Sequence, residues 1–213
     1  MKRRRDFLAQ LAAGAAALTF DADELRAAST AITSGAWDTS WLDRLAAAKY
    51  RVVFNVSEIS DGAALDYSST FFDHYHEVHG TSDGDTRPVL VIRRLGTQLG
   101  FNDAMWNKYE IGADTKTNDP LTHAPARRNV YWSSSDPKAI TIESLQKRGM
   151  ISLVCNIALG NVGTRFAERT KQDVETVRAE LRANLVPGAI LVPSGIYALI
   201  RAQNAGCAYM PGT

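Results

Sequence analysis

From residue 50 onward, the pattern of apolar and polar positions predicts strands and helices in alternation. The segment YRVVFNVSE (50–58) is apolar, β-branched and bounded by polar residues, which is typical of a buried strand. Residues 61–80 follow as a predicted helix that ends at Gly80. RPVLVIRRLG (87–96) predicts a second strand, and residues 100–112 predict a second helix, also ended by a glycine.

The alternation resumes after an irregular segment. Residues 113–140 contain two Asp-Pro steps and little periodicity, so we expect a long loop, and loops of this length in compact domains are usually functional or disordered. The elements expected after it are a helix at 141–149, a segment at 150–159 that begins as the third strand, a helix at 162–185, a strand at 189–194, a helix at 195–206 and a short strand at 207–210.

This order of elements predicts the fold class. Strands separated by helices of ten or more residues require crossover connections, which give a mainly parallel sheet. We therefore expect a three-layer α/β/α fold of flavodoxin-like type with a mainly parallel five-stranded sheet. Ligands of such folds gather at the carboxyl ends of the strands, and Cys155 lies near the end of the third strand.

The N-terminus, MKRRRDFLAQLAAGAAALTF, has the layout of an export signal: a basic start followed by a short Ala-rich apolar run. The stretch Arg4-Arg5-Asp6-Phe7-Leu8 resembles the twin-arginine export signature. We expect residues 1–36 to hold the signal and the start of a linker, 37–48 a linker or short helix, and 49–213 the folded domain. The protein is then periplasmic or otherwise exported, and an uncleaved signal would anchor it to the membrane. The alternative is an amphipathic N-terminal helix with a basic end.

Charge and composition exclude some functions. The chain has 24 basic and 23 acidic residues, a net charge of +1, and 45% hydrophobic residues, enough for a full core. A nucleic-acid-binding protein would need clustered Lys and Arg, so we expect no nucleic-acid partner. No stretch of 18 or more apolar residues follows the N-terminus, so we expect contact with a membrane only through the signal.

Two segments carry a resemblance to a known family. LVPSGIYALIRAQNAGCAYM (191–210) resembles the closing strand–helix–strand of the DsrE/DsrF-like (sulfur-relay) family, and GMISLVCNIAL (149–159) resembles its central strand, which ends in a cysteine. The resemblance covers about residues 49–213 and implies a DsrE-like fold, a homo-oligomer, and sulfur carried as a persulfide on Cys155. The chain differs from the family pattern in its export signal, in the insertion at 113–140, and in Cys207, where an aromatic residue is common.

The chemistry of Cys155 has two readings. A thiolate is the nucleophile toward sulfane sulfur, and Asn156, Asn161 and the Gly160/Gly163 segment are consistent with a loop that offers it backbone donors. The alternative is a buried structural thiol, because free cysteine is among the most buried residue types. A disulfide with Cys207 is not expected, since Cys207 begins its strand whereas Cys155 ends one.

Other side chains are weaker candidates for a site. Lys108, beside a helical aromatic cluster, and Arg127 and Arg128, in the long loop, are candidates to line a site for an anion. Asp73, His76, Glu77 and His79 fall close together on a helix, but without a closed ligand set a solvated helix end is the better interpretation. We expect no metal and no cofactor.

Two functions remain open from the sequence, besides a metal-binding periplasmic protein, which would rest on the histidines alone. The first is an exported sulfur-handling or thiol-redox protein that uses Cys155 with an unknown sulfur donor or acceptor protein. The second is a non-catalytic, oligomeric small-ligand-binding module in which Cys155 is structural. In either case we expect a homo-oligomer, with Arg127, Tyr131 and Trp132 of the long loop as candidate contacts.

Overall fold

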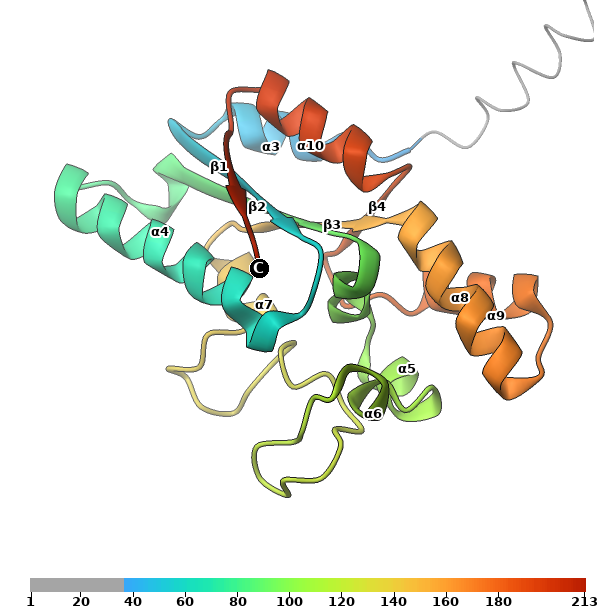
Figure 1. Cartoon of the computed structure of the whole chain (residues 1–213). Helices are drawn as coiled ribbons and strands as arrows, with labels where there is room; N and C mark the ends of the chain where they lie inside the picture. Colours follow the sequence, from blue (N-terminus) through green and yellow to red (C-terminus); the bar gives the residue numbers. More distant parts are fainter. Residues whose placement is uncertain (1–36) are drawn as a thin grey trace, which may run out of the picture. The chain divides into compact units, whose positions relative to one another are not determined.

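The computed structural model describes residues 37–213 (Figure 1). The export signal predicted for residues 1–36 lies outside the described residues. The five strands form one parallel sheet in the order β4-β3-β2-β1-β5. Their bounds are β1 Tyr50–Val56, β2 Thr86–Ile92, β3 Ile151–Cys155, β4 Ile190–Val192 and β5 Ala208–Pro211. The prediction of a three-layer α/β fold with a parallel five-stranded sheet is confirmed.

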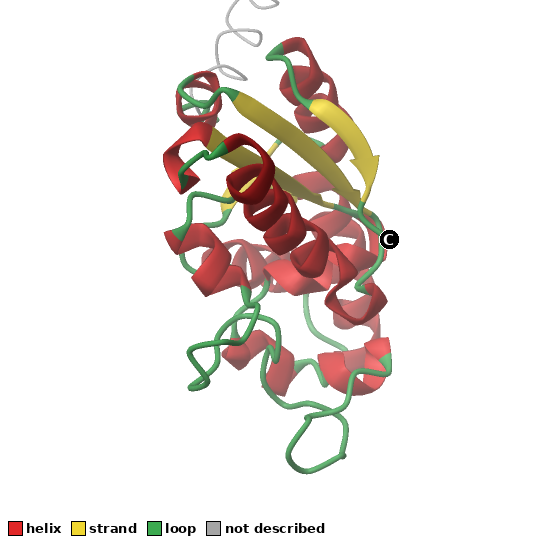
Figure 2. Cartoon of the chain, turned by 90° about the vertical axis from the view of Figure 1, so that its left-hand side faces the viewer, coloured by secondary structure: helices red, strands yellow, loops and turns green. Residues whose placement is uncertain are grey.

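Helices cover both faces of the sheet (Figures 1 and 2). One face carries α3 (Trp41–Ala46) and α10 (Gly195–Asn204). The other carries α4 (Ala63–His79), α7 (Ile142–Lys147) and α8 (Asn156–Thr170), with α9 (Val174–Ala183) packed on α8. The short helices α5 (Asp103–Lys108) and α6 (Ile111–Thr115) lie on the same side.

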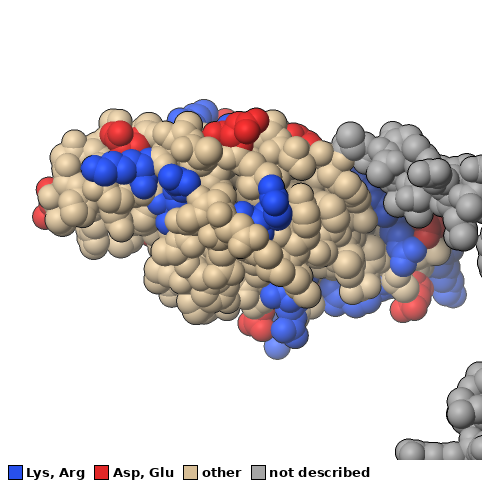
Figure 3. All heavy atoms as spheres, turned by 90° about the horizontal axis from the view of Figure 1, so that it is seen from above, with Lys and Arg blue, Asp and Glu red and all other residues tan. Residues whose placement is uncertain are grey.

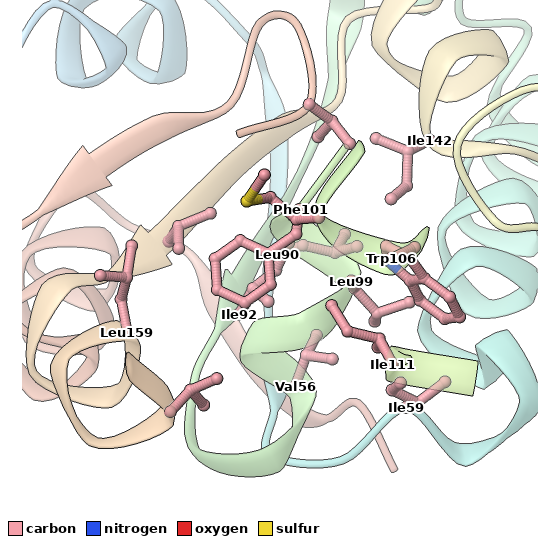
Figure 4. Packing of buried hydrophobic residues seen from close by; sticks show 14 of the residues in the cluster. Val56, Ile59, Leu90, Ile92, Leu99, Phe101, Trp106, Ile111, Ile142 and Leu159 are labelled. Carbon is pink, nitrogen blue, oxygen red and sulfur yellow. The ribbon is translucent and has the colours of Figure 1, made fainter. Parts of the chain in front are cut away.

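The alternation of side chains along each strand produces two hydrophobic cores. In β1, Phe54 faces the core under α4 and α8, whereas Val53 faces the core under α3 and α10. The larger core contains the cluster in Figure 4, in which Ile92 of β2, Leu159 of α8 and Trp106 of α5 come together from distant parts of the sequence. Trp41 of α3 is completely buried in the smaller core, so α3 belongs to the folded unit.

The predicted bounds of two helices were wrong, whereas the expected end of the third strand at Cys155 is confirmed. The helix that follows, α8, begins with Asn156 and not at residue 162, because the Cys155 side chain caps it. The helix predicted at 162–185 is two helices, since Lys171 takes a left-handed conformation and Asp173 caps α9. The helix predicted at 100–112 is the pair α5 and α6, interrupted by Glu110 at a φ of 48°.

A 3-10 segment, η3 (Arg94–Gly100), follows β2 and reaches from the carboxyl edge of the sheet toward α5. Shorter 3-10 segments, η1 (Ser60–Gly62) and η2 (Asp83–Asp85), precede α4 and β2.

The long loop expected at 113–140 begins only at residue 116, because α6 extends to Thr115, and it is anchored to the domain. The side-chain amide of Asn129 is buried and donates to the carbonyl oxygens of Leu99 and Phe101 at 2.9 and 2.8 Å. Tyr131 and Trp132 are half-buried against the larger core of the same chain. These two side chains therefore stabilise the position of the loop within the chain. Their expected contact with a second copy stays a prediction.

Lys and Arg side chains are interspersed with Asp and Glu on the face seen in Figure 3. Within residues 37–213, no helix is both long and apolar enough to cross a membrane.

Candidate functional site

The carboxyl ends of three neighbouring strands bring the candidate site together. Val154 at the end of β3 pairs with Ile92, the last residue of β2, and Cys155 pairs with Val192, the last residue of β4. The residues that directly follow β2, β3 and β4 therefore meet at one edge of the sheet. They line a cleft of about 280 Å³, whose lining residues are Arg93, Arg94, Cys155, Ile157, Ala158, Asn161, Ser194, Gly195 and Ile196.

Cys155 occupies the cap position of α8. Its backbone is extended, with φ −73° and ψ 114°, and its Sγ accepts a hydrogen bond from the backbone N–H of Ala158 at 3.3 Å. The first turn of a helix has N–H groups without helical partners, so a sulfur atom here replaces the usual oxygen of a capping side chain. Only 5% of the residue's surface is exposed. The thiol therefore lies in the wall of the cleft, with little of its surface open to solvent.

Arg93 holds the neighbouring segments together. Its backbone N–H donates to the carbonyl oxygen of Val56, and its guanidinium donates to the side-chain oxygen of Asn55 at 3.2 Å. Its aliphatic stem lies against Gly195, where an added Cβ would approach the Arg93 Cδ to 2.8 Å. Glycine at position 195 thus allows the start of α10 to pack directly on the arginine.

Arg94 has a different environment. It adopts a left-handed backbone conformation, with a φ of 52°, and it is exposed. Its guanidinium has no ion-pair or hydrogen-bond partner among residues 37–213. A non-glycine residue held in this conformation is strained, and such strain is often found at functional sites. Arg94 therefore offers the cleft an uncompensated positive charge.

Two helix N-termini adjoin the same cleft. The α8 helix starts beside Cys155, and α10 starts at Gly195, where the Ser194 side chain accepts a hydrogen bond from the N–H of Tyr197 at 3.0 Å. Helix N-termini favour negative charge, as do guanidinium groups. The arrangement is therefore a thiol set in an electropositive cleft.

The predicted loop around Cys155 is a helix. Asn156, Gly160, Asn161 and Gly163 all belong to α8, so the prediction of a glycine-rich loop after the cysteine was wrong. Asn161 lines the cleft, whereas the side-chain oxygen of Asn156 accepts a hydrogen bond from the Arg182 Nε at 2.9 Å. Gly163 serves the contact with α9, because a Cβ there would lie 2.8 Å from the Arg178 Cγ.

The three basic residues expected to line the site do not line this cleft. Lys108 pairs with Glu180 at 2.7 Å, and this hydrogen-bonded pair raises the pKa of the lysine. Arg127 pairs with Glu110 at 2.8 Å, and Arg128 pairs with Asp119 at 2.9 Å. Both ion pairs stabilise the conformation of the long loop. Their charges are balanced by these carboxylates.

Arg93 and Arg94 were missed from the sequence because both fell within the strand predicted at 87–96. The structure ends β2 at Ile92. The signal was present in the sequence: two consecutive charged residues directly after a completely apolar run mark the end of a buried parallel strand.

Cys207 lies in a different environment. It precedes β5, and Ala208 pairs with Val52 near the start of β1, so Cys207 lies toward the opposite edge of the sheet from Cys155. Both thiols are free. Burial raises the pKa of the Cys207 thiol to about 11, and the nearby Arg51 only partly offsets this effect.

The histidine-rich end of α4 makes contacts within the protein. His76 Nε2 lies 3.1 Å from a carboxylate oxygen of Asp83, and Asp73 accepts a hydrogen bond from Arg148 at 2.8 Å. The ring of His79 stacks on Tyr50 with 5.3 Å between the centroids. Across the described part of the chain, no three His, Cys, Asp or Glu side chains are grouped as metal ligands would be.

Comparison with known proteins assigns no family. No family model matches the chain, and no curated protein matches it. Among solved structures it is similar to MTH1491, a protein of unknown function from Methanobacterium thermoautotrophicum, with 17% identity and a TM-score of 0.39. That alignment covers 76% of this chain and 98% of MTH1491.

Proposed function

We propose that this protein is an exported sulfur-handling protein that carries sulfur as a persulfide on Cys155. The observation that supports this proposal is the position of Cys155, in a cleft that also holds Arg93, Arg94 and the N-termini of two helices. Polysulfides and persulfides are anions, and these groups favour an anion beside the sulfur.

The reaction needs no cofactor. The Cys155 thiolate attacks a sulfur atom of a polysulfide chain, and a new Sγ–S bond forms as one S–S bond of the donor breaks. The shortened polysulfide leaves with the electron pair of the broken bond. The charge of the resulting persulfide is then opposed by Arg94 and accommodated by the backbone N–H groups at the start of α8.

The resemblance of residues 149–159 and 191–210 to the DsrE/DsrF-like family supports the same function. With it we propose membership of that family, a homo-oligomeric assembly, and exchange of sulfur with a donor or acceptor protein. The twin-arginine-like stretch at residues 4–8 supports export to the periplasm.

A second function is favoured by one observation. Cys155 is only 5% exposed and its Sγ already accepts a hydrogen bond as a helix cap, which is what a structural thiol would show. In that case the cleft belongs to a non-catalytic ligand-binding module. The two functions differ in the reactivity of the thiol.

Alkylation of the folded full-length chain by iodoacetamide separates them. We expect Cys155 to be modified at neutral pH. Cys207 should stay unmodified. Burial raises its pKa to about 11, so at neutral pH it is the protonated thiol, which does not react. Peptide mapping after a timed quench measures both sites, with unfolded protein as the reference. Equal protection of the two cysteines at neutral pH would favour the structural thiol.

A further inference from the structure

Three adjoining hollows lie in a row that starts at Cys155 and follows the carboxyl edge of the sheet. The cleft at Cys155 adjoins a second hollow of about 460 Å³, which shares Arg94 and Asn161 with it. The second hollow adjoins a third, of about 440 Å³, and shares Leu95 and Arg165 with it. Because each hollow shares wall residues with the next, the three adjoin one another in a row, which we call the groove and which ends at the segment after β1.

The far end of the groove carries charges of both signs. Glu58 and Lys116 line it, both are exposed, and neither side chain has an ion-pair or hydrogen-bond partner within residues 37–213. The other acidic residue there, Asp114, is already engaged by Gln98 at 2.6 Å and by Arg165 at 3.5 Å. An unpaired carboxylate and an unpaired ammonium group therefore share this end of the groove.

Strained backbone is concentrated along the same groove. Seven non-glycine residues of the described part of the chain have positive φ, and three of them line the groove: Ser60 at 44°, Arg94 at 52° and Lys116 at 57°. Lys116 ends α6 in this conformation, and left-handed residues are also common at binding sites, where they fix the positions of polar groups.

The size and charge of the groove together indicate a ligand class. Sites for small organic molecules usually measure about 300–1,000 Å³, and the second and third hollows are each of this size. An inorganic polysulfide of a few atoms would occupy only the first hollow, beside Cys155. We infer that the groove binds a small peptide persulfide, with its sulfur at Cys155, a carboxylate at Arg94, and the ammonium and carboxylate of a terminal amino acid at Glu58 and Lys116. This inference rests on the proposed function and specifies its sulfur donor.

The transfer step is balanced without an oxidant or reductant. The Cys155 thiolate attacks the outer sulfur of the peptide persulfide, and the Sγ–S bond forms as the S–S bond of the peptide breaks. The peptide leaves as its thiolate and takes a proton from solvent, while the persulfide remains on Cys155.

The test compares two donors on the reduced full-length chain. Glutathione persulfide and inorganic polysulfide are each supplied over a range of concentrations, and single-turnover formation of the Cys155 persulfide is followed by intact mass. Lys116→Gln removes the charge at the far end of the groove. Lys171→Gln is the matched control, because Lys171 is also exposed and also has a left-handed backbone, with a φ of 54°, but does not line the groove.

We expect Lys116→Gln to raise the half-saturating concentration of glutathione persulfide about fivefold, as the loss of one exposed ion pair would, and to leave the value for polysulfide unchanged. Lys171→Gln should change neither. Transfer from both donors with no effect of Lys116→Gln would overturn the peptide donor and leave the proposed function intact. Transfer from neither donor would overturn the proposed function itself.

Discussion

Arg94 is held at the edge of the sheet at a cost in backbone strain, and no carboxylate among the described residues balances its charge. The nearby Arg93, by contrast, is tied to Asn55 and packs against Gly195. The two arginines thus have separate roles, since Arg93 joins β1, β2 and α10, whereas Arg94 supplies the electrostatic field of the cleft. A charge placed for this purpose should act on anions that approach Cys155.

We predict that Arg94→Gln slows alkylation of Cys155 by the anion iodoacetate about fivefold, because a charge–charge interaction of about 1 kcal/mol is lost. Alkylation by neutral iodoacetamide should change much less. Arg201→Gln, on an exposed part of α10 outside the cleft, is the control. Equal slowing with both reagents would show that Arg94 acts through the structure of the cleft and not through its charge.

At the scale of elements, two helical glycines have different roles. A Cβ at Gly112 of α6 would lie 2.3 Å from the carbonyl oxygen of Ala126, which belongs to the backbone of the long loop. A Cβ at Gly160, within α8, would meet only the Arg178 Nε at 3.8 Å. The first glycine therefore permits the loop to pack on α6, and the second serves no close contact.

Gly112→Ala should consequently lower the free energy of unfolding by about 1–3 kcal/mol, as overpacking does. Gly160→Ala should raise it by about 0.5–1 kcal/mol, because alanine is favoured over glycine inside a helix. Urea denaturation followed by circular dichroism measures both. A Gly112→Ala variant as stable as the unmodified chain would mean that the loop is not held against α6.

The sheet could be predicted because its strands are continuous apolar runs, and the position of Cys155 at the carboxyl edge followed from the parallel connections. The arrangement of side chains around Cys155 could not be predicted from the sequence. Cys155 caps α8, and cysteine is not among the usual capping residues, so the start of that helix carried no sequence signal. The pairing of Lys108 with Glu180 depends on α9 folding back onto α5, which local patterns do not specify.

At the scale of the whole molecule, the proposal requires a folded domain outside the cytoplasm. On the face seen in Figure 3, Lys and Arg side chains are interspersed with Asp and Glu, and the two thiols of the domain are free. For such a protein we expect export by the twin-arginine route, because the stretch at residues 4–8 resembles its signature.

Replacing Arg4 and Arg5 together by lysine should keep the protein in the cytoplasm, since the signature depends on the arginine pair itself and not on positive charge. Cell fractionation with immunodetection measures the result, and Arg3→Lys, adjacent to the pair, is the control. Unchanged export of the double variant would remove the twin-arginine assignment.

The central claim, that Cys155 accepts sulfane sulfur, is tested most directly by loading the protein. The reduced full-length chain is incubated with inorganic polysulfide, freed of excess reagent and weighed by intact mass spectrometry. The account predicts a gain of about one sulfur atom that is kept in Cys207→Ser and lost in Cys155→Ser. An unchanged mass, or a gain that survives Cys155→Ser, would contradict it.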